Sequence, residues 1–261
     1  MSRLTRPAPL LAALLAATLA GCITSGGGRE VDNTAAADSN VKLGVAYMNE
    51  GRMELAKEKL ERAGGQDPKN ADVQFALAEL YSRLEQPKVA DRHYRAAIDL
   101  APDKLEIVNG YAVFLCTNQE VDRGIAQFEK LMHNPLYGRQ AAAATNAGMC
   151  LRDQKRHGES VRFFETALAK QPDWLEAVVQ LADVQILLEN PVAARAAVDK
   201  YQSMRNSATA LVMGVRAAVK EGNCNAARTY TLKLRKDFPN SRETLQLLPQ
   251  VTGACADSAR Q

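Results

Sequence analysis

The fold is decided by two consecutive stretches, ADSNVKLGVAYMNEGRMELAKEKLERAGGQDPKN (37–70) and ADVQFALAELYSRLEQPKVADRHYRAAIDLAPDK (71–104). They have equal length and share the spacing of their aromatic, small and proline residues. The matching pairs, each 34 residues apart, are Tyr47 and Tyr81, Ala56 and Ala90, Ala63 and Ala97, and Pro68 and Pro102. A period of 34 residues in this order is typical of a helix–turn–helix unit that stacks on its own copies. The pattern therefore predicts an interaction scaffold.

The same spacing continues, at lower similarity, through four further units. They cover 105–140, 141–174, 175–208 and about 208–241. The third unit is two residues longer, with the excess near Pro135, and the fifth has no loop proline. The pattern resembles the tetratricopeptide repeat and implies an all-α, right-handed superhelical solenoid of about six repeats over 38–241, followed by a C-terminal cap or tail at 242–261. The alternative is a generic helical bundle, which also has a 3.6-residue period but has no reason to repeat at 34.

Small residues mark the places where the two helices of a unit should cross. The eighth and twentieth places hold Gly44 and Ala56 in the first unit, and Ala78 and Ala90 in the second. Backbones approach closely at a crossing only where the side chains are small. The apolar face of each unit is then buried by its neighbours, so stability arises from stacking.

The pattern of residues at the N-terminus predicts that the protein is exported from the cytoplasm. Arg3 and Arg6 precede an apolar run over 8–20, which is too short to span a bilayer by itself. A basic start, a short apolar run and small residues after it are typical of a secretory signal peptide. We therefore expect residues 1–21 to be removed.

The signal ends in a stretch that predicts a lipid anchor. Leu19-Ala20-Gly21-Cys22 resembles the bacterial lipobox, which implies that Cys22 is acylated and becomes the mature N-terminus. The alternative is an ordinary signal peptide with a chance cysteine. Because Ile23 rather than aspartate follows, the resemblance implies forwarding to the outer membrane, with the protein on its periplasmic face. Several acyl carbons on one residue anchor more firmly than a single chain.

Residues 22–37 are rich in Gly, Ser, Asn, Asp and Ala and predict a flexible tether. As a coil of this length it would hold the solenoid roughly 20 Å from the membrane. The formal charge is +3, and loss of Arg3 and Arg6 with the signal lowers it to +1. This near-neutral charge gives no support for a nucleic-acid partner.

Four cysteines remain after Cys22, an even number in an oxidising compartment. Cys116 and Cys150 lie on the expected first helices of the third and fourth units, which are neighbours in a solenoid, so we predict a disulfide between them. Cys224 and Cys255 could form a second disulfide that pins the C-terminal cap. Buried free thiols are the alternative for both pairs. Neither pair has the spacing of a redox or zinc motif.

The sequence contains no recognisable catalytic constellation. His93, His133 and His157 fall in three different units, and no zinc-protease, nucleophile-elbow or phosphate-loop motif is present. We therefore expect a protein that is not an enzyme and that binds no metal, cofactor or small-molecule substrate.

The whole arrangement resembles one family. The signal, lipobox, tether and six units, together with Tyr111-Ala112-Val113-Phe114-Leu115-Cys116 and Gly148-Met149-Cys150, are similar to the type IV pilus biogenesis lipoproteins PilW and PilF. The resemblance implies a pilotin, which brings the type IV pilus secretin to the outer membrane and promotes its oligomerisation. A repeat lipoprotein that serves outer-membrane barrel assembly or regulates cell-wall synthases is the alternative. The residues alone indicate only an outer-membrane lipoprotein that binds a peptide or a partner surface.

The partner is expected in the concave groove of the solenoid. The second, fifth, ninth, twelfth and thirteenth places of each first helix should line it, and a mixture of apolar and polar residues there suits an amphipathic segment. The groove residues that we predict are Val41, Val45, Met48, Asn49, Phe75, Glu79, Arg83, Asn109 and Val113. The fifth place, which includes Phe75, is expected to face the groove and not the interface between units. The alternative is that these are exposed apolar residues without a function.

Overall fold

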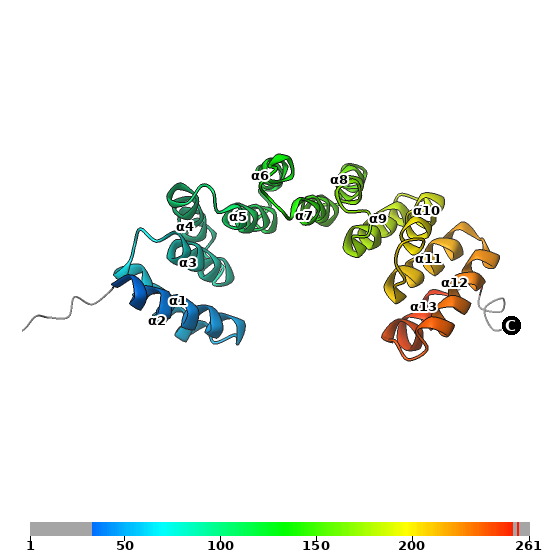
Figure 1. Ribbon diagram of the computed structural model, residues 1–261, viewed down its shortest axis with the longest axis horizontal. Helices are drawn as coiled ribbons and strands as arrows, with labels where there is room; N and C mark the ends of the chain where they lie inside the picture. Colours follow the sequence, from blue (N-terminus) through cyan, green and yellow to red (C-terminus); the bar gives the residue numbers. More distant parts are fainter. Residues whose placement is uncertain (1–32, 253–254, 256–261) are drawn as a thin grey trace, which may run out of the picture.

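The computed structural model describes residues 33–252 and residue 255, and no β-strand occurs among them. Figure 1 shows an arc of helices, with α3, α5, α7 and α9 on its inner side and α4, α6, α8 and α10 on its outer side. The helices are α1 (Asn33–Asn49), α2 (Met53–Gln66), α3 (Ala71–Arg83), α4 (Pro87–Leu100), α5 (Leu105–Thr117), α6 (Val121–His133), α7 (Gln140–Asp153), α8 (His157–Lys170), α9 (Leu175–Leu187), α10 (Pro191–Gln202), α11 (Ala208–Glu221), α12 (Cys224–Asp237), the π-helix η1 (Glu243–Leu247) and α13 (Leu248–Val251). The predicted all-α solenoid is confirmed.

The six predicted units coincide with six helix pairs, from α1 with α2 to α11 with α12. In each pair the two helices pack on one another, and successive pairs pack together. One boundary differs from the expectation. Because α1 begins at Asn33, residues 33–37 of the predicted tether are helical. Ala37 is fully buried in the core of the first unit, which explains why the helix extends so far back.

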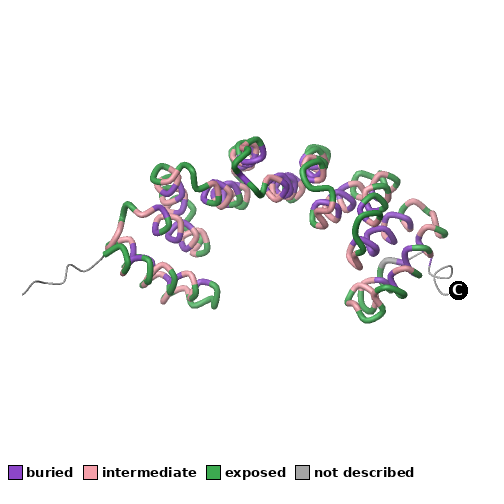
Figure 2. Tube along the Cα trace, viewed as in Figure 1, coloured by how far each residue is buried: buried purple, intermediate pink, exposed green. Residues whose placement is uncertain are grey.

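The helices of a pair cross at the small residues that the sequence marks. Gly44 of α1 lies so close to Leu60 of α2 that a Cβ on this glycine would be 2.5 Å from the leucine side chain. Gly148 of α7 has the same relationship, also at 2.5 Å, to Phe164 of α8. Figure 2 shows the buried positions along the lines where helices meet. The close approach therefore depends on residues with little or no side chain.

The turn between the two helices of every pair contains one residue in the left-handed region. These residues are Gly51, Glu85, Gln119, Lys155, Glu189 and Gly222. The next backbone N–H returns to the carbonyl five residues earlier, as from Arg52 to Tyr47 and from Gln86 to Tyr81, both at 2.9 Å. This hydrogen bond ends the first helix in a Schellman motif. Four of the six turns achieve this without glycine.

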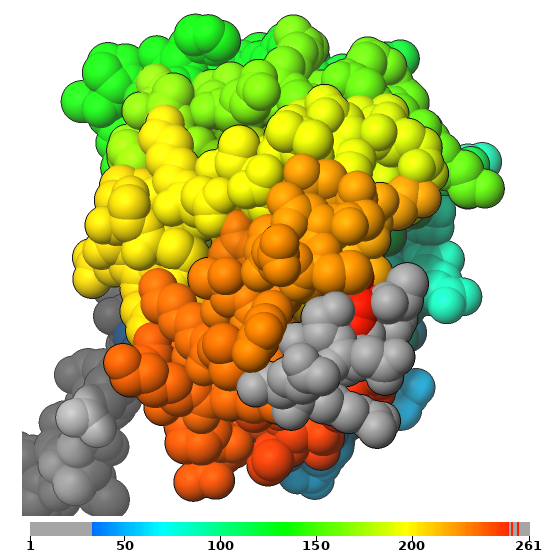
Figure 3. Space-filling view, turned by 90° about the vertical axis from the view of Figure 1, so that its right-hand side faces the viewer, coloured from blue at the N-terminus to red at the C-terminus, as the bar shows by residue number. Residues whose placement is uncertain are grey.

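The two ends of the arc are closed differently. Leu77 in the second unit is only 4% exposed because it packs on the first unit, whereas Leu43, at the same place in the first unit, is 48% exposed. At the other end η1 and α13 pack on α11. Leu248 and Cys255 are buried there, in the same cluster as the α11 side chains. Figure 3 shows this end, with α11 to α13 in orange and red.

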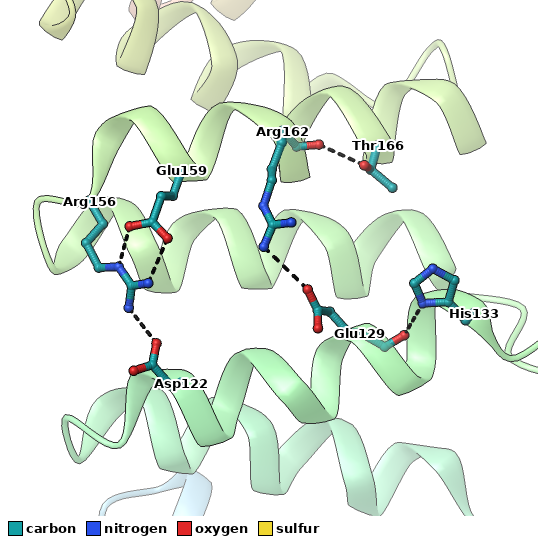
Figure 4. A network of polar contacts seen from close by, with 7 residues as sticks. All are labelled: Asp122, Glu129, His133, Arg156, Glu159, Arg162 and Thr166. Atoms are coloured by element: carbon teal, nitrogen blue, oxygen red, sulfur yellow. Dashed lines mark hydrogen bonds and ion pairs between the residues drawn. The ribbon is translucent and has the colours of Figure 1, made fainter.

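Exposed ion pairs link neighbouring units on the outer side of the arc. Arg156, directly before α8, binds Asp122 of α6 at 2.7 Å and also pairs with Glu159. Arg162 of α8 pairs with Glu129 of α6 at 3.4 Å (Figure 4). Such solvent-exposed pairs contribute at most about 1 kcal/mol each. Apolar stacking between units therefore provides most of the stability. Within the described residues, no helix is both long enough and apolar enough to cross a membrane.

Candidate partner-binding groove

The inner side of the first unit offers little exposed apolar surface. Met48, which the sequence assigned to the groove, is 4% exposed and packs in the core of the first two units. Val41 and Val45 are half-buried against the same core. Asn49 is exposed. The prediction for Met48 was therefore wrong, because α3 packs over the end of α1 where this side chain lies.

The second unit corrects the prediction for the fifth place. Phe75 is half-buried, and its ring lies against Gly110 of α5, where a Cβ would be 2.7 Å from Phe75 Cε2. The ring also meets Tyr94 of α4 edge to face, with centroids 6.0 Å apart. Phe75 thus fills the interface between the second and third units instead of facing an open groove. The expectation that this place avoids the interface was wrong.

Two tyrosine hydroxyls behind the groove are held by carboxylates. The Tyr94 hydroxyl donates to Glu79, and the Tyr111 hydroxyl donates to Asp91 at 2.7 Å. Burial raises the pKa of Tyr94 far above its ordinary value, and the nearby Glu79 charge adds to this effect. Burial also raises the pKa of Tyr111, and the hydrogen bond to Asp91 adds to this effect. Glu79 therefore completes an internal contact, and only part of it faces solvent.

The remaining predicted residues are accessible on the inner side. Arg83 is exposed and donates from Nη1 to the carbonyl of Met48 at 3.1 Å. Asn109 is half-buried and accepts from Asn146 of α7 at 3.4 Å. Val113 is 43% exposed and borders a hollow of about 330 Å³ between α5 and α7. The open part of the predicted groove therefore lies in the middle of the solenoid.

A disulfide lines this central hollow. Cys116 of α5 is bonded to Cys150 of α7, with the two Cα atoms 5.6 Å apart, as the sequence predicts. The second pair, Cys224 and Cys255, is also bonded and ties the C-terminal segment to the start of α12. The first disulfide joins two inner helices of successive units. It therefore holds the walls of the hollow in a fixed relationship.

A second hollow, missed by the sequence analysis, measures about 750 Å³ and lies where the end of the fourth unit meets the fifth and sixth units. We call it the Trp174 pocket. Its lining consists of Gln171, Asp173, Trp174, Leu175, Glu176, Val179, Tyr201, Arg205 and Thr209. Glu176 and Val179 occupy the second and fifth places of their unit, which were expected to line the groove. The only sequence signal was Trp174, the single tryptophan of the chain, directly before α9.

Other predicted sites are separate from both hollows or are not described. The predicted signal peptide and the acylation site Cys22 lie outside the described residues. The three histidines occupy different helices, α4, α6 and α8. Within residues 33–252 and 255, no group of three or more His, Cys, Asp or Glu side chains is placed to hold a metal ion.

Comparison with known proteins agrees with this architecture. The family model described as tetratricopeptide repeat matches residues 37–70 and 71–104. The chain is 28% identical over 235 residues to the type IV pilus assembly protein PilF of Pseudomonas aeruginosa, which covers 88% of this chain and 93% of the relative.

Two solved structures share the fold along nearly the whole molecule. The structure of Pseudomonas aeruginosa PilF superposes with a TM-score of 0.60 and 26% identity, and covers 84% of this chain and 99% of that one. The crystal structure of PilW, described as a widely conserved type IV pilus biogenesis factor, gives a TM-score of 0.59 and 30% identity, and covers 81% of this chain and 98% of that one. With this identity and nearly complete coverage, the chain belongs to the PilF and PilW family of tetratricopeptide repeat proteins.

Proposed function

We propose that this protein acts in type IV pilus biogenesis as a lipoprotein pilotin of the outer membrane. It would bind a segment of the pilus secretin on its inner face and promote the localisation and oligomerisation of the secretin there. The observation that carries the proposal is the similarity to PilF and PilW over four fifths or more of the chain. PilF is described as a pilus assembly protein and PilW as a pilus biogenesis factor.

The geometry of the inner face supports a binding role of this kind. A solenoid offers a long continuous surface on which an extended or helical segment can lie. Here the surface includes the hollow beside Val113 and the Trp174 pocket, each with apolar and polar lining residues. The lipobox at Cys22 supports anchoring at the membrane. Anchoring would raise the effective concentration of the protein near a secretin that inserts in the same membrane.

We also propose that the protein is a binding scaffold and not an enzyme, with a protein partner and no nucleic-acid or small-molecule substrate. The near-neutral charge and the absence of a catalytic motif in the sequence support this view.

A capture experiment tests the proposal. The tagged, acylated protein is solubilised in detergent from cells that assemble pili, and the captured proteins are identified by mass spectrometry. We expect the secretin to be captured. Capture of barrel-assembly proteins or cell-wall synthases without secretin would contradict the pilotin role and favour the alternative family of functions.

A matched pair of surface variants locates the interaction. Val113→Glu places a charge on the inner face, and Leu136→Glu places one in the loop between α6 and α7, where the leucine is 88% exposed. Because both side chains are exposed, neither change should unfold the protein. We expect Val113→Glu to lower secretin capture, since partner binding would bury the new charge without an opposite charge beside it, which is unfavourable. Leu136→Glu should leave capture unchanged.

A further inference from the structure

The Trp174 pocket contains an unfilled apolar space at an interface that is filled elsewhere in the molecule. Phe75 and Val179 both occupy the fifth place of their units, the second and the fifth. The Phe75 ring fills the interface with the next unit by packing against Gly110. Val179 has a much smaller side chain, and a cavity of about 750 Å³ lies beside it. The second unit therefore gives a precedent for an aromatic ring at this place, packed there against a glycine.

The walls of the pocket suit such a ring. Trp174, Leu175, Val179 and Tyr201 contribute apolar and aromatic surface from the start of α9 and the end of α10. Thr209 contributes from the first turn of α11. Aromatic side chains bury a large area and pack favourably on other rings. A pocket of this size that combines apolar and aromatic walls with polar side chains is typical of sites that receive a ligand side chain.

The charges at the rim predict what accompanies the ring. Asp173 accepts hydrogen bonds from Arg205, with Nη2 at 2.8 Å and Nε at 3.0 Å, so these two charges balance one another. Glu176 is exposed and, within the described part of the chain, forms no ion pair; Gln180 donates to it at 3.4 Å. The rim therefore carries one unbalanced negative charge. A basic residue near the ring would complement it.

We propose that the Trp174 pocket receives an aromatic side chain from a peptide segment of the partner protein, and that a Lys or Arg next to this aromatic residue faces Glu176. The identification of the partner as the secretin rests on the proposed function. The pocket would act as an anchor point near the C-terminal end of the inner face, about three units away from the surface that the sequence analysis favoured.

Short peptides test the pocket without any secretin. The probes are acetylated and amidated tetrapeptides, Ala-Lys-Phe-Ala and its variants Ala-Lys-Ala-Ala and Ala-Glu-Phe-Ala, titrated into the soluble protein that begins after Cys22. Trp174 is the only tryptophan, so intrinsic fluorescence reports directly on the pocket. We expect a saturable change with Ala-Lys-Phe-Ala, weaker binding of Ala-Glu-Phe-Ala and no saturation with Ala-Lys-Ala-Ala. No saturable change with Ala-Lys-Phe-Ala would overturn the proposal.

Three variants connect the fluorescence signal to the pocket. Val179→Phe fills the cavity from within and should abolish peptide binding, whereas Val41→Phe makes the same change at the fifth place of the first unit and should retain it. Glu176→Gln removes the charge of this exposed residue while it keeps the size of the side chain. It should lower the affinity for Ala-Lys-Phe-Ala by about twofold to fivefold. Circular dichroism checks that each variant is folded. If Val179→Phe does not fold, Glu176→Gln decides, and unchanged affinity in that variant would refute the assigned basic contact.

Secretin capture with the same variants separates this inference from the proposed function. Reduced capture by Val179→Phe, with normal capture by Val41→Phe, supports both. If wild-type protein captures secretin and Val179→Phe captures it equally well, the pocket is not the anchor and the pilotin role stands. If wild-type protein captures no secretin but binds Ala-Lys-Phe-Ala, the pocket is a peptide site and the pilotin role fails.

Discussion

The ring of Phe75 in α3 occupies the space beside Gly110 in α5 that any other residue would fill with a side chain. The two residues belong to different units, so their contact helps to set how the second unit stacks on the third. A Cβ at Gly110 would lie 2.7 Å from Phe75 Cε2 and 3.1 Å from Cζ. The ring also meets Tyr94 edge to face, which restricts its movement.

Gly110→Ala is therefore expected to destabilise the protein. Overpacking at a filled interface costs about 1–3 kcal/mol, which should exceed the gain of up to about 1 kcal/mol from replacing a helical glycine by alanine. Denaturant unfolding followed by circular dichroism measures the difference. Gly65→Ala in α2 is the matched control, because nothing lies within 4 Å of a Cβ there, and it should stabilise the protein. Equal stabilisation by both changes would contradict this account, because it would show that the Phe75 ring moves aside at little energetic cost.

The left-handed turn residues give a second, opposite pair of expectations. Lys155 has φ of 60° and Gly51 has φ of 74°, at equivalent turns of two units. A non-glycine residue in the left-handed region destabilises the folded state by roughly 1–2 kcal/mol. Glycine removes this strain, but part of the gain is lost because glycine makes the unfolded chain more flexible. Lys155→Gly should raise the midpoint of thermal unfolding slightly. Gly51→Ala should lower it, although its Cβ would meet open space. A rise for Gly51→Ala would contradict this account.

The repeat spacing predicted the helix pairs and their crossing points well. A crossing requires small residues at fixed places of one unit, and Gly44 and Ala56 are local features that a sequence displays directly. The pairing of Cys116 with Cys150 also followed from the repeat, because successive first helices are neighbours. Turn residues such as Glu85 were not predictable from their type. Their conformation is imposed by the returning backbone hydrogen bond and not by side-chain preference.

The lining of the groove was predicted less well because it depends on pairs of residues in different units. The place convention puts Phe75 on the inner face, but the missing side chain of Gly110, 35 positions later, draws the ring into the interface. A charged side chain in place of Phe75 would therefore lower the stability of this interface. The Trp174 pocket escaped notice for the same reason. Val179 leaves a cavity only because its neighbours in α10 and α11 do not fill it.

A carboxylate between the fifth and sixth units should make stability depend on pH. Glu221 accepts a hydrogen bond from Arg195 at 2.8 Å, which holds the pKa of this carboxyl below its ordinary value of 4.5. Because its pKa is lower in the folded than in the unfolded state, the stabilisation is present above the unfolded pKa and is lost as pH falls through the folded one. The thermal midpoint of the wild type should therefore decrease more between about pH 5 and about pH 3 than that of Glu221→Gln. Parallel pH profiles of the two proteins would rule out this contribution.

The disulfide between Cys116 and Cys150 should stabilise the solenoid without being required for its fold. It closes a loop with a sequence separation of 34, which on the chain-entropy model is worth roughly 3–4 kcal/mol. The double variant Cys116→Ser with Cys150→Ser should lower the thermal midpoint while the helical circular dichroism signal below the transition stays the same. Mass spectrometry of non-reduced peptides from periplasmic protein checks that the bond forms. Two free thiols in the wild type would refute the prediction.

The proposed lipid anchor predicts that Cys22→Ala releases the protein from the outer membrane, because acylation requires the thiol of this residue and more than one acyl chain on a residue anchors more firmly than a single chain. The expected result is soluble periplasmic protein in place of protein that sediments with outer membranes, with secretin multimers reduced in number or found elsewhere. Cys224→Ser with Cys255→Ser is the control, since it removes two other cysteines and should leave sedimentation unchanged. The soluble Cys22→Ala protein should still capture detergent-solubilised secretin, because the inner face is intact. Loss of anchoring with normal secretin multimers would show that the tether is dispensable, whereas a variant that still sediments with outer membranes would refute the lipid anchor itself.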